Sequence, residues 1–275
     1  MSSLQPLWKK LKYLLWCIAH EAIFYFGWFM GPIVMWLISD FKIEGQRNMP
    51  TKGGVMLTSN HQSQWDLVAI HNILPRSFYQ MAKVEIFEVF FVGGVVRVWG
   101  AFPVQRGKAD RQALSRSIEL LKEGKLLNIF PEGHRSDNYA LIEAHKGAAL
   151  IALQADATIV PVAITGTELI SRKTKWKKGK PFFHRRPPVT VRVGKPYKLP
   201  KAGPGQRDDL EELTDLMMSR IAELMPPEYQ GEYAPQKLAT RKALREQTKL
   251  EQINKKAARK AARLGGTSST EEVTP

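Results

Sequence analysis

Short apolar runs alternate with helical patterns through the middle of the chain, and this alternation restricts the fold more than any other feature. The helical patterns cover Ser63–Leu74, Asp110–Lys122 and Ala144–Gln154. Alternating strands and helices predict an α/β fold with a mixed, mostly parallel sheet flanked by helices. Active sites in such sheets lie beyond the carboxyl ends of the strands. The runs expected to form strands are Val55–Ser59, Ser77–Ala82, Ala101–Val104, Leu126–Phe130, Thr158–Ile164 and Val189–Val193.

Residues 13–38 form a long apolar segment that contains one acid, Glu21. The segment exceeds the roughly 20 apolar residues that span a bilayer. However, Glu21 would cost about 2.5–3.5 kcal/mol near the bilayer centre, and Gly31-Pro32 is expected to break the helix. The segment is compatible with two short helices that lie in one leaflet and also with a single kinked helix that spans the bilayer. A buried hairpin in a soluble core is the alternative. We expect membrane association, either monotopic or single-pass. Three basic residues before the segment favour a cytoplasmic location for this end of the chain: Lys9, Lys10 and Lys12.

The net charge of +15 predicts an anionic partner. Residues 172–198 hold eleven Lys or Arg and no acid, and residues 234–275 hold ten Lys or Arg and four Glu. Anionic lipid headgroups fit this charge. Nucleic acid would fit it equally, but the sequence has no helix-turn-helix, zinc or RNA-recognition signature, so no nucleic acid is expected. A single cysteine, Cys17, excludes a disulfide framework and a cysteine-rich zinc site.

Composition divides the chain into three parts. Residues 1–38 are expected to form membrane-associated helices, and residues 39–233 a catalytic domain. Residues 234–275 are expected to form a basic helical tail with a disordered end, because they are polar and rich in Lys, Arg and Ala.

The segment Val55–Leu67 carries a histidine and an aspartate at a strand-to-helix turn. If His61 lies in the turn, Asp66 lies in the first turns of the helix and can reach back to the imidazole. The carboxylate then fixes the tautomer, and the other ring nitrogen is free to take a proton from a substrate hydroxyl. A hydrogen-bonded core histidine is the alternative interpretation.

Three further segments follow predicted strands. Phe130–Ser136 holds Glu132, which can bind either an arginine or a substrate hydroxyl, and Gly133, which lets the backbone approach a ligand. Arg135 in the same segment and Arg106 in Gly100–Gly107 have the planar guanidinium that suits a phosphate. Ile159–Gly166 is apolar with a proline inside the run, and is expected to form a wall or to supply a backbone donor.

In this order and spacing, the four segments resemble the glycerolipid acyltransferase family, and most closely the 1-acyl-sn-glycerol-3-phosphate acyltransferases. The resemblance covers about residues 40–200. It implies a glycerol-3-phosphate acyltransferase-like fold and transfer of a fatty acyl group from a thioester to a glycerolipid hydroxyl at the cytoplasmic membrane face. Glycerol-3-phosphate, another lysophospholipid or an aminolipid remain alternative acceptors, and a non-catalytic module that binds membranes or polyanions remains the alternative function.

The resemblance also implies residue roles. His61 is expected to be the general base and Asp66 its partner. His134 is a rival base, and Lys146-Gly147 at a helix start can contact phosphate. We expect acyl-CoA or acyl carrier protein as co-substrate and no metal or cofactor, because the thioester is already activated. The residues expected to bind the glycerophosphate are Lys83, Arg106, Glu132, Gly133, Arg135 and Ser136.

Overall fold

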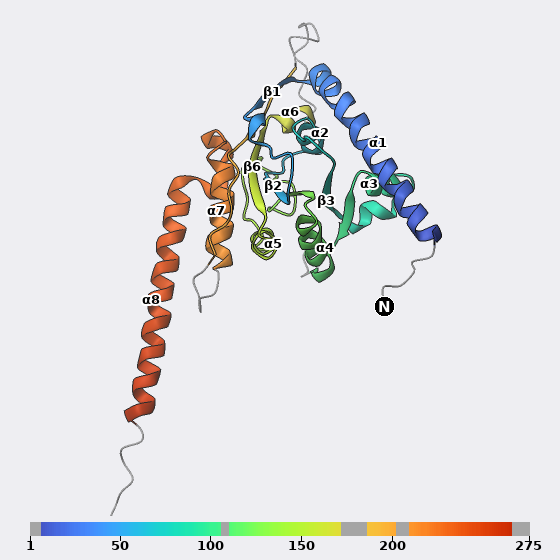
Figure 1. The fold of residues 1–275 in the computed structure, drawn as a ribbon. Coiled ribbons are helices and arrows are strands. Elements are labelled where there is room, and N and C mark those ends of the chain that lie inside the picture. The colour runs from blue at the N-terminus through green and yellow to red at the C-terminus, as the bar shows by residue number, and fades with distance from the viewer. Residues whose placement is uncertain (1–6, 106–109, 172–185, 202–208, 266–275) are drawn as a thin grey trace, which may run out of the picture. The chain divides into compact units, whose positions relative to one another are not determined.

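The computed structural model describes residues 7–105, 110–171, 186–201 and 209–265. The chain divides into two compact units, residues 1–233 and residues 234–275. The second unit contains the long helix α8 (Pro235–Gly265). The first unit contains the sheet and the described residues of the four segments expected to carry the site (Figure 1).

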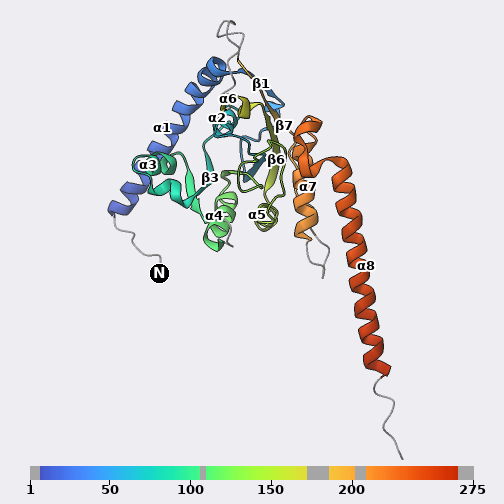
Figure 2. The same cartoon turned by 180° about the vertical axis from the view of Figure 1, so that it is seen from behind.

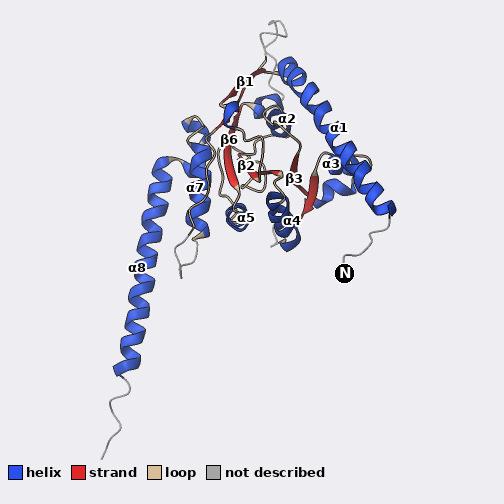
Figure 3. Ribbon diagram, in the orientation of Figure 1, coloured by secondary structure: helices blue, strands red, loops and turns tan. Residues whose placement is uncertain are grey.

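The sheet of the first unit has seven strands in the order β1-β7-β6-β2-β5-β3-β4. Figure 3 shows the strands in red, with helices around them. Strand β7 runs antiparallel to β6, and every other neighbouring pair is parallel. This confirms the predicted mixed, mostly parallel sheet. The strands are β1 (Asp40–Glu44), β2 (Val55–Ser59), β3 (Phe78–Lys83), β4 (Ala101–Val104), β5 (Leu126–Ile129), β6 (Thr158–Thr165) and β7 (Pro188–Val193).

Helices cover both faces of the sheet. On one face Leu57 of β2 belongs to a buried core with Ile70 of the short α2 and Phe24 of α1. On the other face Met56 belongs to a core with Leu120 of α4. Successive residues of β2 therefore serve opposite cores, as the alternating side chains of a strand require. The helices of this unit are α1 (Leu7–Ile38), α2 (Asp66–His71), α3 (Val92–Val98), α4 (Arg111–Lys122), α5 (Gly147–Ala155), α6 (Thr167–Ser171) and α7 (Leu210–Ala222).

The N-terminal helix differs from the sequence prediction. The expected break at Gly31-Pro32 was wrong, because α1 continues through Pro32 to Ile38. Proline removes one helical hydrogen bond, but buried contacts on both sides of it, made by Phe24 and Met35, hold the helix against the sheet unit. By length and composition, α1 is the one helix among the described residues that can cross a membrane.

Two other elements differ from the prediction. Strand β1 was not predicted, because its sequence, Asp40–Glu44, alternates charged with apolar residues and forms an edge strand whose alternate side chains are exposed. Helix α2 was predicted from Ser63, but it begins at Asp66. Residues 60–65 form an extended turn instead, and this turn carries the predicted histidine.

Candidate active site

The turn after β2 is held to the neighbouring strand by an asparagine. The Asn60 side chain donates from Nδ2 to the carbonyl oxygen of Ile164 and accepts at Oδ1 from the amide of Ile164, both at 2.8 Å. Asn60 is 1% exposed. These two hydrogen bonds extend the pairing of β2 with β6 by one residue beyond the end of β2. They therefore fix the point and the direction in which the chain leaves the sheet, just before His61.

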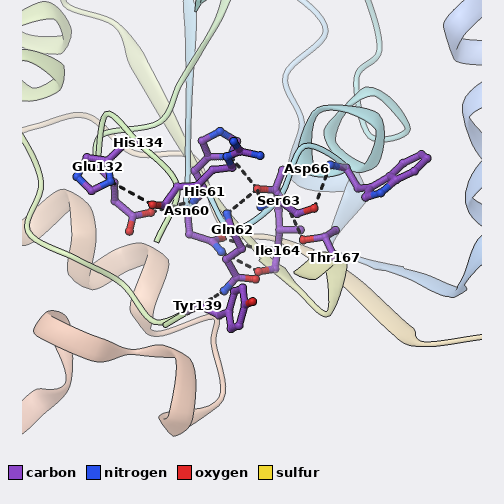
Figure 4. Close-up of polar contacts among 12 residues, drawn as sticks. Asn60, His61, Gln62, Ser63, Asp66, Glu132, His134, Tyr139, Ile164 and Thr167 are labelled. Atoms are coloured by element: carbon purple, nitrogen blue, oxygen red, sulfur yellow. Dashed lines mark hydrogen bonds and ion pairs between the residues drawn. The ribbon is translucent and has the colours of Figure 1, made fainter. Parts of the chain in front are cut away.

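His61 and Asp66 form the pair that the sequence predicted. The Nδ1 atom of His61 lies 2.8 Å from Oδ2 of Asp66 (Figure 4). The Asp66 side chain is fully buried, and the His61 side chain is 13% exposed. With the proton on Nδ1 and donated to Asp66, the Nε2 atom of His61 is left as the acceptor, the arrangement that a general base requires.

Asp66 also organises the backbone of the turn. Its Oδ2 atom accepts from the amides of Gln62 at 2.7 Å and Ser63 at 2.8 Å. Its Oδ1 atom accepts a hydrogen bond of 2.5 Å from Oγ1 of Thr167, the first residue of α6 (Figure 4). Four donors therefore compensate the burial of one carboxylate, and they fix its direction toward the imidazole.

The second predicted segment packs directly against the histidine. The Phe130 ring stacks on the His61 ring, with centroids 4.1 Å apart. The carbonyl oxygen of His61 accepts from the amide of Ser136 at 3.0 Å. The Ser136 hydroxyl, also buried, donates to the loop's own backbone at Ala140. Gly133, which lies between Phe130 and Ser136 in the sequence, has a φ of +73°. A Cβ at this position would lie 2.8 Å from the His145 ring. Glycine is therefore required for the turn of this loop.

Glu132 is buried beneath the histidine turn. Its Oε1 atom accepts from the amide of His61 at 2.9 Å, and its Oε2 atom accepts from the amide of Ile142 at 3.0 Å. Burial raises the pKa of Glu132 to about 7, while these two amide donors act to lower it. Both oxygens thus have backbone partners, and the carboxyl group ties the turn at His61 to the loop that follows β5.

The remaining predicted residues lie farther from the pair or outside the described residues. Lys83 ends β3, at the same edge of the sheet as His61, and its Nζ lies 2.8 Å from Oε1 of Glu85. Arg135 is exposed in the loop that contacts His61. His134 is exposed too, and its Nδ1 atom faces the backbone oxygen of Arg135. Arg106 lies outside the described residues.

Comparison with known proteins shows which enzymes the chain is similar to. The sequence matches the family described as Acyltransferase over residues 40–165. A 1-acyl-sn-glycerol-3-phosphate acyltransferase of Bacillus subtilis (strain 168) is 29% identical over 194 residues, which are 70% of this chain and 92% of that protein. The crystal structure of the 1-acyl-sn-glycerophosphate (LPA) acyltransferase, PlsC, from Thermotoga maritima superposes with a TM-score of 0.53 at 24% identity, covering 80% of this chain and 84% of that one. Residues 40–165 of the chain therefore form an acyltransferase domain, in a fold similar to that of PlsC.

Other relatives in this family are longer than the matched region. The human 1-acyl-sn-glycerol-3-phosphate acyltransferase beta is 31% identical over 140 residues, which are 50% of this chain and 50% of that protein. The chloroplastic enzyme LPAT1 of Arabidopsis thaliana is 34% identical over 128 residues, which are 36% of its length. The chain therefore matches half or less of these two relatives but nearly all of the Bacillus subtilis acyltransferase.

Thr167 is a residue of this acyltransferase that sequence reasoning missed. It follows Gly166 at the end of β6, but only the observed order of the strands brings it next to Asp66. We predict that Thr167→Val lowers kcat about tenfold, because a hydrogen bond to a charged group contributes about 1.5–3 kcal/mol. Steady-state kinetics of acyl transfer would measure the effect. Thr167→Ser keeps the hydroxyl and should restore most of the activity. If it does not, Thr167 does not affect kcat through its hydrogen bond to Asp66.

The raised pKa of Glu132 predicts a pH dependence of stability. A carboxyl group whose pKa is about 7 in the folded protein and 4.5 in the unfolded chain binds more protons when folded between these values. Its contribution to the free energy of unfolding therefore falls as the pH rises from 4.5 to 7, by up to about 3 kcal/mol.

Urea unfolding of the wild type and of Glu132→Gln at several pH values would test this prediction. The glutamine does not titrate, so the stability of the wild type relative to the variant should fall as the pH rises through this window. If the difference in the free energy of unfolding between the wild type and Glu132→Gln does not change with pH, the carboxyl group keeps its ordinary pKa.

Proposed function

We propose that this chain transfers a fatty acyl group from acyl-CoA, or from acyl carrier protein, to the sn-2 hydroxyl of 1-acyl-glycerol-3-phosphate and so forms phosphatidic acid. The observation that carries the proposal is the contact between Nδ1 of His61 and the buried carboxylate of Asp66. Relatives named 1-acyl-sn-glycerol-3-phosphate acyltransferase, from bacteria, plants and humans, support this choice of acceptor.

In the proposed reaction His61 acts as the general base. Its Nε2 atom takes the proton of the acceptor hydroxyl as the oxygen attacks the thioester carbonyl carbon. Asp66 stabilises the imidazolium that forms. The C–S bond then breaks, and the imidazolium returns its proton to the leaving thiolate. The products are the new ester and the free thiol. A positioned base contributes about 10²–10⁴-fold to such a step.

Direct transfer in a ternary complex is part of the proposal, without an acyl-enzyme and without a metal or cofactor. The thioester is already activated, so the residues need only generate the nucleophile and hold the two substrates. Mass spectrometry of the enzyme incubated with acyl-CoA alone tests this point. The mass should stay that of the free protein, and a stable acyl adduct would contradict direct transfer.

We propose that the phosphate of the acceptor is bound by the cations that follow the strands: Lys83, Arg106 and Arg135. Gly133 would give the headgroup access to the loop backbone, while Glu132 and Ser136 would shape this loop through their contacts with His61. Residues 39–233 would then be the catalytic domain. The basic residues 172–198 and 234–275 would attract anionic headgroups at the cytoplasmic face of the membrane.

An acceptor panel tests the proposed substrate. Purified enzyme and labelled oleoyl-CoA would be incubated separately with 1-acyl-glycerol-3-phosphate, glycerol-3-phosphate and lysophosphatidylcholine, and the products identified. We expect the highest kcat/KM with 1-acyl-glycerol-3-phosphate. A higher value with another acceptor would change the substrate, and no transfer to any acceptor would contradict the enzyme function. Repeating the assay with oleoyl carrier protein identifies the donor.

A further inference from the structure

Helix α6 is too short to hold its own position. It has five residues, Thr167–Ser171, whereas isolated helices shorter than about 12 residues are marginal in water. Its first residue nevertheless makes a closely defined contact. The Oγ1 atom of Thr167 lies 2.5 Å from Oδ1 of Asp66, and both residues are fully buried (Figure 4). Tertiary contacts must therefore fix α6 where Thr167 can reach the carboxylate.

The second residue of α6, Glu168, supplies one such contact. Its side chain is buried, and its Oε1 atom accepts a hydrogen bond of 2.8 Å from the hydroxyl of Tyr229. Its other oxygen, Oε2, is buried without a hydrogen-bond partner among the described residues. A buried carboxyl group is costly unless it is hydrogen-bonded, so the Tyr229 hydroxyl is the contact that fixes this side chain. Burial raises the pKa of Tyr229, and the hydroxyl therefore stays protonated as the donor.

Tyr229 belongs to a short segment that follows α7. Residues 227–233 form two single-turn 3₁₀ helices, Pro227–Tyr229 and Gly231–Tyr233. Helix α7 packs against β6, and the chain runs from it into this segment (Figures 1 and 2). The segment belongs to the same compact unit as the candidate site, although it lies beyond the family match, which ends at residue 165.

The same segment also holds the loop that follows β5. The amide of Leu141 donates to the carbonyl oxygen of Tyr229, and the amide of Glu232 donates to the carbonyl oxygen of Leu141, both at 2.9 Å. Gly231 between them has a φ of +48°. A Cβ at this position would lie 2.1 Å from the carbonyl oxygen of Leu141. Glycine is therefore required for this close approach of the two backbones.

The loop after β5 in turn supports the turn that carries His61. The amide of Ile142 donates to Oε2 of Glu132, and Oε1 of Glu132 accepts from the amide of His61. The carbonyl oxygen of Tyr139 accepts from the side-chain amide of Gln62 (Figure 4). Residues 227–233 thus contact two elements that reach the candidate catalytic pair. One follows β6 and the other follows β5, the two neighbours of β2 in the sheet.

We infer that the hydroxyl of Tyr229 is a positioning group for acyl transfer. It holds Glu168 and thereby α6, so that Thr167 stays within reach of the Asp66 carboxylate. That carboxylate is then directed toward the imidazole of His61. The inference rests on the proposed role of His61 and Asp66 in catalysis. It goes beyond that role because it assigns a part in the reaction to a segment far along the chain from both residues.

The full-length variant Tyr229→Phe tests the inference, because it removes the hydroxyl and keeps the ring and the backbone contacts with Leu141. We expect kcat for transfer from oleoyl-CoA to 1-acyl-glycerol-3-phosphate to fall about threefold to tenfold, as for the loss of one hydrogen bond, with KM for both substrates unchanged. A group that positions the base changes the rate of the chemical step. Wild-type kinetics, or a change confined to KM, would therefore overturn the inference.

The matched control is Tyr197→Phe. Tyr197 pairs with Ile159 near the start of β6, the end away from α6, and its buried hydroxyl has no hydrogen-bond partner within the described part of the chain. This variant makes the same chemical change in the same unit, and kcat should stay that of the wild type. Thermal unfolding of both variants reports their stability. Equal losses of kcat in the two variants would mean that the hydroxyl of Tyr229 has no specific role.

A double-mutant cycle decides whether Tyr229 acts through Thr167. The variant Thr167→Val/Tyr229→Phe should be hardly slower than Thr167→Val alone, because the contact that Tyr229 supports is already lost. Losses in kcat that multiply would show that the two residues act independently, and the inference would be wrong. His61→Ala is assayed in parallel. A large loss there with wild-type kcat in Tyr229→Phe rejects this inference alone, whereas full activity of His61→Ala rejects the proposed function as well.

Discussion

Replacing His61 with alanine should lower kcat for acyl transfer to 1-acyl-glycerol-3-phosphate by about 10²–10⁴-fold, the usual contribution of a positioned general base. The residue donates its backbone amide to Glu132 and accepts at its carbonyl from Ser136, and alanine keeps both contacts. Only the imidazole and its stacking on Phe130 are lost. The expected result is therefore a large loss in kcat with a folded protein and little change in KM.

The control for this prediction is His134→Ala. His134 is two residues from Glu132 in the same loop, but its Nδ1 atom faces the backbone oxygen of Arg135, whereas Nδ1 of His61 contacts a buried carboxylate. The loss in kcat caused by His134→Ala should be clearly smaller than the loss caused by His61→Ala. If His134→Ala abolishes transfer and His61→Ala does not, the base has been assigned to the wrong histidine. Thermal unfolding of both variants would exclude a loss of fold.

The sequence predicted the sheet because the strands that matter for the site are buried and apolar. Runs such as Val55–Ser59 and Leu126–Ile129 are buried along their whole length, so composition alone marks them as strands. The edge strand β1, Asp40–Glu44, carries three charged residues and gives no such signal. Nor does any local pattern reveal that β1 pairs with β7, since the partner is far along the chain.

The candidate site was predictable where its contacts are local. His61 and Asp66 are five residues apart, and a turn is enough to join them. The contacts that hold the pair in place are not local. Asp66 meets Thr167 only because β6 lies next to β2, and Glu132 reaches the amide of His61 only because β5 lies on the other side of β2. Strand order depends on tertiary packing, so these supporting residues could be recognised only in the structure.

The prediction for α1 failed for a related reason. Gly31-Pro32 is a strong local signal for a helix end, yet the helix continues to Ile38. The buried residues before and after the proline, Phe24 and Met35, are held in the core of the folded unit. Here tertiary contacts outweigh the local preference.

Asp66→Asn should lower kcat on the order of 10³-fold or more, because the uncharged amide no longer stabilises the imidazolium that forms in the transition state. The amide has the shape of the carboxylate and can turn its oxygen toward the donors from His61, Gln62 and Ser63, with its NH₂ group toward Thr167. The fold should therefore survive with a loss of about 1–3 kcal/mol in the free energy of unfolding.

The matched control for Asp66→Asn is Asp209→Ala. Asp209 begins α7 and also accepts backbone amides, at 3.1 and 3.2 Å, from Glu211 and Glu212. Asp209→Ala should lower the free energy of unfolding by about 1 kcal/mol and leave kcat unchanged. The comparison therefore separates an effect on stability from an effect on catalysis. The double variant His61→Ala/Asp66→Asn should be hardly slower than His61→Ala alone, because the aspartate acts through the imidazole. Independent, additive losses in kcat would show that Asp66 does not work through His61.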